Sequence, residues 1–228
     1  MGRTLRAAEG GWVYHVLNRA NARRPIFKKS GDYSAFEAIL EAGVERYDMR
    51  LLAYCLMGNH WHLLLWPKAD GDLSRFMGWI TLTHAQRWHA HRKSAGSGHL
   101  YQGRFKSFPV QEDEHFYTVC RYVERNALRA NVVERAEDWQ SSSLWRRLHG
   151  SLEQRACLSK WPLPEPKLWR RFVNQAESEA ELAALRRSVR RGSPFGDAVW
   201  TGWTAAALGI ESSLTPRGRP RKQPTELK

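Results

Sequence analysis

The sequence has few cysteines and lacks any long apolar run. Cys55, Cys120 and Cys157 are the three cysteines among 228 residues. This odd, scattered set excludes a disulfide framework and a CxxC metal site. No apolar run approaches the ~20 residues of a membrane-spanning helix, and the first residues contain no apolar core of a secretory signal. These absences favour a cytoplasmic protein in a reducing compartment over a membrane or secreted one.

Acidic residues are also scarce beside the basic ones. Lysine and arginine number 36 against 23 aspartates and glutamates, which gives a formal net charge of +13. Such an excess favours a polyanionic partner, nucleic acid first and an anionic membrane surface second. A merely basic protein without such a partner is the simpler interpretation. Eleven tryptophans would suit base stacking, although we expect most of them in the core.

The order of strand and helix signals predicts an α+β fold. Short apolar runs at 12–18, 50–57, 60–66 and 104–110 are expected to be strands, and the Gly58-Asn59 turn joins the second and third as a hairpin. Apolar residues at helical spacing lie between the other strands, from residue 32 to 47 and from 72 to about 88. The order β-α-β-β-α-β is that of a ferredoxin-like, four-stranded antiparallel sheet.

A third helix, expected over residues 113–128, would cover the second face of the sheet. Along the strand at 60–66, alternate side chains point to opposite faces. One set would lie beneath the first two helices: Trp61, Leu63 and Leu65. The other set contains His60 and His62 together with two apolar residues, so it needs a cover of its own. We therefore expect helices on both faces.

The rest of the chain divides into two further parts. Residues 1–150 are predicted to form the main domain, and 151–210 a helical extension with a proline-rich linker at 161–167 and helices over 176–191 and 197–208. Residues 211–228 are basic and have few large apolar side chains, which is typical of a disordered tail.

The sharpest chemical pattern is His60-Trp61-His62. Two histidines at i and i+2 of a strand hold their imidazoles side by side, where two neutral ring nitrogens can share one divalent metal ion. A pair of strand histidines with no ligand role is the simpler interpretation of this motif alone. A third ligand would come from the covering helix, on which Tyr122 and Asn126 are four residues apart and share a face.

These side chains together suit the chemistry of phosphodiesters. A metal ion with neutral ligands keeps its full charge and can polarise a phosphate oxygen, and a tyrosine can attack in line and store the bond as a phosphotyrosine. For Tyr122 alone, a partly buried tyrosine with a satisfied hydroxyl is the simpler interpretation. Tyr117 is a rival on the same helix, but we expect it to point elsewhere. A hydrolytic metallonuclease would use water in place of either tyrosine.

Three segments in this order resemble a known family. MGNHWHLLL at 57–65, YQGRFKS at 101–107 and RYVERNALRANVV at 121–133 are similar to the REP-associated tyrosine transposases. These are bacterial relatives of the insertion-sequence-200-like transposases, among the single-strand endonucleases named for their His-hydrophobic-His (HUH) motif. The resemblance covers residues 10–150, and the stretch at 190–222 resembles the tail region of the same group.

The resemblance implies an enzyme that cleaves and rejoins single-stranded DNA beside hairpins of repetitive extragenic palindromes. Such enzymes leave a 5′-phosphotyrosine and a free 3′-hydroxyl, use Mg²⁺ or Mn²⁺, and act at the bacterial nucleoid. His60 and His62 match the metal-binding pair, and Tyr122 matches the nucleophile. Asn126 stands where relatives often have a glutamine as a polar metal ligand, and Asn126-Ala127 replaces the usual Asn-Pro.

Two alternatives to this function stay open at this point. The first is a binder of structured nucleic acid that keeps the fold and the charge without catalysis, and the second is a hydrolytic metallonuclease. The sequence also leaves open whether the protein is a monomer or a dimer that exchanges tyrosine helices.

Basic side chains near these motifs predict how DNA would be held. Arg104 and Lys106 alternate on the predicted fourth strand and would hold phosphates near the metal. The row of arginines on the tyrosine helix begins at Arg121, and a solvated helix edge is its simpler interpretation. The predicted DNA-binding residues are Arg19, Arg23, Arg24, Arg104, Lys106, Arg125, Arg129, Arg217 and Arg219.

The last two of these arginines lie in the Arg-Gly-Arg-Pro segment of the tail. This segment resembles the AT-hook, in which arginines enter the narrow minor groove of an A·T-rich duplex. A generic basic tail held by charge alone is the alternative.

Overall fold

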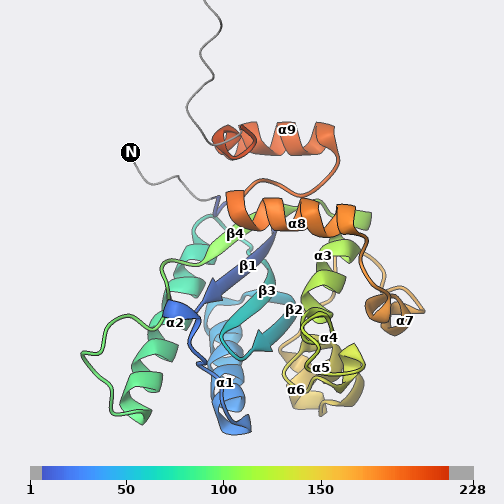
Figure 1. The fold of residues 1–228 in the computed structure, drawn as a ribbon. Helices are drawn as coiled ribbons and strands as arrows, with labels where there is room; N and C mark the ends of the chain where they lie inside the picture. The colour runs from blue at the N-terminus through green and yellow to red at the C-terminus, as the bar shows by residue number, and fades with distance from the viewer. Residues whose placement is uncertain (1–6, 216–228) are drawn as a thin grey trace, which may run out of the picture.

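The computed structural model describes residues 7–215 as a four-stranded antiparallel sheet with helices on both faces (Figure 1). The sheet order is β2-β3-β1-β4, which is the order of the predicted ferredoxin-like fold, so the fold prediction is confirmed. The strands are β1 (Val13–Arg19), β2 (Arg50–Met57), β3 (His60–Trp66) and β4 (Lys106–Val110).

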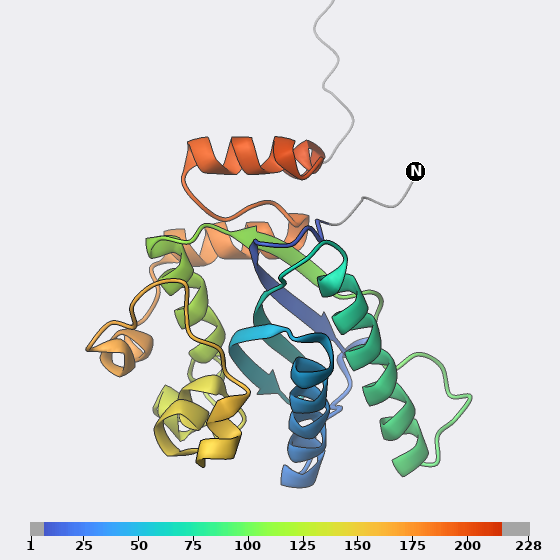
Figure 2. The same ribbon diagram turned by 180° about the vertical axis from the view of Figure 1, so that it is seen from behind.

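Two long helices, α1 (Ser30–Tyr47) and α2 (Asp72–His91), cover one face of the sheet (Figure 2). Trp61, Leu63 and Leu65 of β3 are fully buried in the core beneath them, with Phe36 of α1 and Phe76 of α2. This is the face that strand alternation predicted for these three residues.

The second face is covered by α3 (Glu114–Glu124). Phe116, Val119 and Val123 recur at three- and four-residue spacing on α3 and belong to one buried core with Leu64 of β3. Asp113 caps the helix by accepting a hydrogen bond from the backbone N–H of His115 at 2.8 Å. The predicted cover for the histidine face is therefore present.

The tyrosine helix ends earlier than the sequence pattern predicted. Arg125 has φ −83° and ψ 0°, which interrupts the helix, and a separate turn, α4 (Asn126–Arg129), follows. The fourth strand also begins later, at residue 106 instead of 104. The chain just before it is bent and pairs with the end of β1, where the backbone N–H of Gln102 donates to the carbonyl of Arg19.

The remaining helices are α5 (Ser143–His149), α6 (Leu152–Ala156), α7 (Trp169–Asn174), α8 (Glu179–Arg191) and α9 (Ala198–Ala207), with 3₁₀ turns η1 (Asn21–Arg23), η2 (Ala136–Asp138) and η3 (Glu211–Ser213). Of these helices, α5 packs against β2 and α6 against α5, whereas α7 packs against α3 and α8 against β4. Between α8 and α9, Phe195 exchanges backbone hydrogen bonds with Pro109 and Gln111, so this segment extends the sheet beyond β4.

Two expectations about the extension need correction. Residues 161–167 contain no helix or strand, yet they are not a free linker, because Trp161 and Trp169 meet edge to face at 4.9 Å against α3. The predicted disordered tail starts too early, since η3 is ordered and Ser213 is buried. The division between residues 1–150 and 151–210 stays a prediction.

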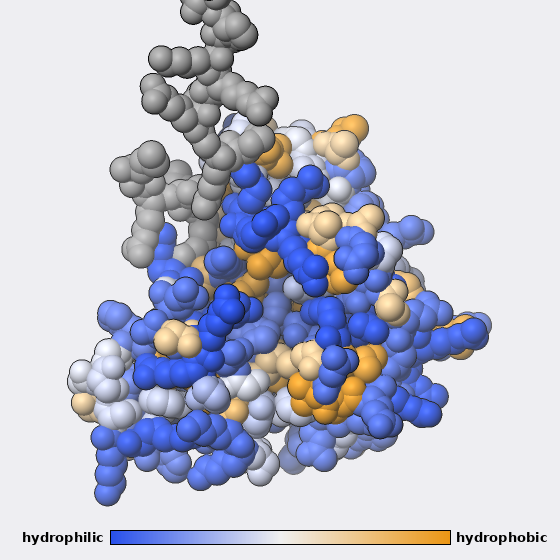
Figure 3. All heavy atoms as spheres, viewed as in Figure 1, coloured by the Kyte–Doolittle hydropathy of each residue, from blue (hydrophilic) through white to orange (hydrophobic). Residues whose placement is uncertain are grey.

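The face of the molecule seen in Figure 3 is mostly hydrophilic, with hydrophobic residues confined to separate patches. Within residues 7–215, no helix is both long and apolar enough to cross a membrane.

Candidate active site

The four residues predicted for metal binding and attack come together between β3 and α3. The ring centroids of His60 and His62 are 5.2 Å apart. Tyr122 is buried, and its ring centroid lies 5.7 Å from that of His62, nearly perpendicular to it. Asn126, the first residue of α4, is also buried, and its side chain lies beside His60. The ring of Tyr122 is thus docked beside His62, the second histidine of the pair, within one chain.

A neighbouring side chain contacts the Nδ1 atom of each histidine. His60 Nδ1 lies 2.7 Å from Asn59 Oδ1 and donates to it, because a carbonyl oxygen only accepts. The orientation of the Asn59 amide is fixed by its Nδ2, which donates to the carbonyl of Arg23. His62 Nδ1 lies 2.8 Å from His15 Nε2. When both Nδ1 atoms carry the proton, both Nε2 lone pairs are free for a ligand.

His15 is a site residue that the sequence reasoning missed. It lies on β1, which is paired with β3, and its ring is fully buried between His62 and Phe108. The signal was present in the alternation of the first strand, which puts His15 and Leu17 on one face. The sheet order was needed to show that this face is continuous with that of His62.

Burial keeps these histidines neutral. Desolvation lowers the pKa of His60 from 6.5 to about 4, and the nearby charge of Arg19 acts in the same direction. Desolvation, aided by Arg129, lowers the pKa of His15 to about 3. The pKa of His62 is held well below its usual value by burial and by the neighbouring histidines. Their imidazoles therefore have unprotonated nitrogens at pH 7, as metal binding requires.

The donor set fits a divalent cation held by two imidazoles and an amide oxygen. No group of three His, Cys, Asp or Glu side chains in residues 7–215 is arranged to hold a metal ion. His15 is already engaged with His62 Nδ1, so it supports a ligand and is not a third ligand itself. Asn126 beside His60 is the polar group that remains to complete the set.

Arg129 holds Tyr122 in two ways. Its guanidinium lies over the tyrosine ring at 4.0 Å from the centroid, and its Nη1 donates to the Tyr122 carbonyl at 3.2 Å. The rival Tyr117 is occupied elsewhere, because its hydroxyl donates to the Pro164 carbonyl at 2.6 Å and its ring packs against Trp169. Of these two tyrosines on α3, only Tyr122 lies beside the histidine pair.

Three of the predicted DNA-binding residues border this site. Arg19 is opposite His60 in the β1–β3 ladder, and within the described part of the chain its Nε is buried without a hydrogen-bond partner. Lys106 is exposed and lies on the same sheet face as His62, because both are paired with Leu17. Arg23 is exposed on the turn that Asn59 Nδ2 ties to the histidine hairpin.

Other predicted DNA-binding residues are placed differently. Arg24 donates to the carbonyl of His99 and lies over the Trp88 ring, on the α2 side of the sheet. Arg104 is exposed in the loop before β4, so the prediction that it alternates with Lys106 on one strand is wrong.

The arginine row on the tyrosine helix is neither a solvated edge nor free for phosphate. Arg125 and Arg129 both form ion pairs with Glu177, and Arg121 is buried and paired with Glu181. Both glutamates belong to the extension, which sequence spacing on the helix alone gave no means of finding. Arg217 and Arg219 lie outside the described residues, so the AT-hook stays a prediction.

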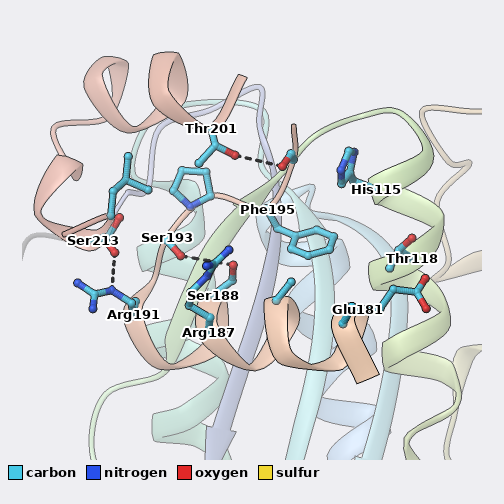
Figure 4. Close-up of a pocket in the computed structure, with 15 residues that line it drawn as sticks. His115, Thr118, Glu181, Arg187, Ser188, Arg191, Ser193, Phe195, Thr201 and Ser213 are labelled. Carbon is cyan, nitrogen blue, oxygen red and sulfur yellow. Dashed lines mark hydrogen bonds between the residues drawn. The ribbon is translucent and has the colours of Figure 1, made fainter. Parts of the chain in front are cut away.

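A separate cavity of about 550 Å³ lies between α3, α8 and the segment leading into α9 (Figure 4). Its lining includes His115, Arg187 and Ser213, whose carbonyl accepts a 2.6 Å hydrogen bond from Arg191 Nε. None of the histidines or tyrosines of the candidate active site lines it. The site on the sheet and this cavity are therefore distinct.

One of the solved structures similar to this chain supports the fold. A REP-associated tyrosine transposase bound to a REP hairpin matches with a TM-score of 0.55 at 15% identity, over 78% of this chain and 93% of that chain. A candidate transposase from Deinococcus radiodurans R1 matches with a TM-score of 0.40 at 19% identity, over 54% of this chain and 96% of the other. No curated protein matches the chain. Residues 10–126, just over half of the chain, match the family described as "Transposase IS200 like". The protein therefore belongs to the IS200-like transposases.

Proposed function

We propose that this protein is a metal-dependent single-strand DNA endonuclease and strand transferase that acts at hairpins of repetitive extragenic palindromes. The observation that carries the proposal is the docking of Tyr122 on His60 and His62, with the Nδ1 atoms of both histidines contacted by neighbours. The side chains proposed as nucleophile, metal-ligating imidazoles and amide ligand are thus neighbours in the structure. The family supports a transposase function, and the choice of Mg²⁺ or Mn²⁺ belongs to the proposal.

The reaction assigned to Tyr122 is an in-line displacement at phosphorus. A bond forms between its phenolic oxygen and the phosphorus as the bond to the 3′-oxygen breaks, and the phenolic proton passes to solvent. The departing strand takes up a proton as a 3′-hydroxyl, and the 5′-phosphate stays on the tyrosine. A divalent cation on His60, His62 and Asn126 would polarise a phosphate oxygen. Attack by another 3′-hydroxyl reverses the displacement and joins a new strand.

The surroundings of the site suit a DNA strand. Arg19 and Lys106 border the histidines and would bind phosphates on either side of the scissile bond. A hairpin as the partner is supported by the likeness of the fold to a REP-associated transposase in complex with one. Within a cell, the proposal places the protein at the bacterial nucleoid.

A covalent-adduct assay tests the proposal. Single-stranded hairpin DNA labelled at its 3′ end is incubated with the protein and Mg²⁺ or Mn²⁺, and the label is followed on a denaturing gel. We expect the label to move with the protein, and to be lost in Tyr122→Phe but kept in Tyr117→Phe, the control on the same helix. Cleavage without an adduct would favour the hydrolytic nuclease, and binding without cleavage would favour the non-catalytic binder.

A further inference from the structure

We propose that Glu177 of the C-terminal extension positions the nucleophile. It holds Arg129 over the ring of Tyr122, and so keeps the tyrosine docked on the histidine pair of its own chain. The inference rests on the function proposed for Tyr122. It assigns the C-terminal extension a role in the reaction, which is to position the nucleophile.

The first step is the burial of Glu177. This residue lies in the loop between α7 and α8, directly before Ser178, which caps α8. Its side chain is 1% exposed, and its two oxygens are divided between two arginines. Oε1 accepts from Arg129 Nη1 at 2.6 Å, and Oε2 accepts from Arg125 Nη1 at 3.2 Å. A buried carboxylate with two charge-assisted partners fixes both arginines in one geometry.

The second step leads from Arg129 to the tyrosine. Arg129 contacts the ring of Tyr122 from 4.0 Å and donates to its backbone carbonyl at 3.2 Å. Tyr122 lies near the end of α3, three residues before the interruption at Arg125. The end of a helix is less constrained than its middle, so a cation held in place over this ring restricts where the phenol can go.

The third step is the contrast with Glu181, the third residue of α8. Its Oε1 accepts from Arg121 at 2.6 Å, and the Arg121 guanidinium lies over the Phe172 ring at 4.2 Å. Glu177 and Glu181 therefore both tie the extension to the same arginine row. They differ in that the contacts of Arg121 lead to α7 and α8, whereas those of Arg129 lead to Tyr122.

Packing offers another explanation for the docked tyrosine. Leu182 and Leu185 of α8 are buried in the same core as α3, and this contact alone would hold the extension against the helix. If packing were sufficient, neutralising Glu177 would leave Tyr122 as protected from solvent as before. The two explanations therefore differ in an observable that requires neither metal nor DNA.

Hydroxyl-radical labelling of the full chain, read by mass spectrometry, measures the exposure of Tyr122 directly. We expect Glu177→Gln to raise labelling of Tyr122 about fivefold, because the weakened contact with Arg129 no longer keeps the tyrosine docked. At saturating hairpin DNA, the rate of adduct formation should fall about tenfold, since a small misplacement of a nucleophile is costly. Glu181→Gln is the matched control and should leave both quantities within about twofold of wild type.

A second variant tests the same inference if Glu177→Gln does not fold. Arg129→Met cuts the same connection on the other side and leaves the pair between Glu177 and Arg125, and it should also expose Tyr122. Unchanged protection in the folded variants, or equal exposure in Glu181→Gln, overturns the inference. If Tyr122 becomes exposed in Glu177→Gln while the wild type forms no adduct, the positioning role stands and the proposed function fails.

Discussion

His15 and His62 lie on neighbouring strands and share one buried hydrogen bond, 2.8 Å from Nε2 to Nδ1. A ligand at His62 Nε2 requires the proton of that ring to be on Nδ1, from which it donates to His15. The other nitrogen of His15, Nδ1, is buried and has no hydrogen-bond partner among the described residues. The hydrogen bond with His15 therefore fixes the orientation and the tautomer of the His62 ring.

We expect His15→Phe to weaken Mn²⁺ binding by about 10- to 100-fold, the usual cost of losing the partner of a metal-ligating histidine. Isothermal titration of the DNA-free protein with Mn²⁺ measures this. His84→Phe is a matched control, because His84 is also buried, but it contacts Tyr101 in the core beneath α1 and α2. Equal Mn²⁺ affinity in His15→Phe and wild type would show that His62 needs no such support.

A related prediction concerns Asn126, the amide member of the proposed ligand set. Removing its carbonyl in Asn126→Ala should lower Mn²⁺ affinity about tenfold. Asn126→Asp should retain or raise the affinity, because it supplies an anionic oxygen at the same place. The same titration separates this from a role as a hydrogen-bond partner of His60 alone, in which case alanine would bind Mn²⁺ as tightly as asparagine.

The sequence predicted what depends on local periodicity and missed what depends on distant pairing. Alternation along β3 was enough to place Trp61 and His62 on opposite faces, whereas Tyr122 was matched to the histidines through the resemblance to a family. It gave no access to Glu177, which meets Arg129 across 48 positions of sequence. A row of arginines is the same pattern whether phosphate or a buried carboxylate neutralises it, so only the tertiary structure tells the two apart.

Acid should destabilise the metal-free protein through its buried histidines. The pKa of His60 is about 4 and that of His15 about 3 in the folded state, against 6.5 for an exposed histidine. The unfolded chain therefore binds more protons as the pH falls below 6.5, and the free energy of unfolding decreases down to about pH 4 through His60 and about pH 3 through His15. Each histidine contributes a slope of up to about 1.4 kcal/mol per pH unit.

Urea unfolding at pH 7, 5.5 and 4.5 measures this slope. His15→Phe should flatten it by about one histidine's share, because the variant no longer takes up that proton on unfolding. A stability that is constant across the range would mean that these rings accept protons in the folded state.

The extension should be part of the folding unit of the catalytic sheet. Trp169 is buried against α3, and its Nε1 donates to Glu124 Oε2 at 2.7 Å; Glu124 is itself fully buried. We expect Trp169→Ala to lower the free energy of unfolding by about 3–5 kcal/mol, through the cavity and the lost donor. Trp203→Ala on α9, where the residue is 61% exposed, should cost about 1 kcal/mol or less.

Urea unfolding of both variants measures these costs, and a fragment ending at residue 150 should fail to give a cooperative transition. A stable, cooperatively folding fragment of that length would support two independent domains, as the predicted boundary at residue 150 allows.

The tail beyond Thr215 should bind duplex DNA through Arg217 and Arg219. Deleting residues 216–228 leaves the ordered turn at Glu211–Ser213 intact, so the effect of the tail can be measured by itself. If both arginines neutralise a phosphate, the slope of log affinity against log salt concentration becomes shallower by about 2.

An AT-hook also requires the loss of affinity to be larger for an A·T-rich duplex than for a G·C-rich one, because the arginines read the narrow minor groove. Fluorescence anisotropy at several salt concentrations measures both quantities. Equal losses on the two duplexes would identify a generic basic tail, and an unchanged slope would remove the tail from DNA binding altogether.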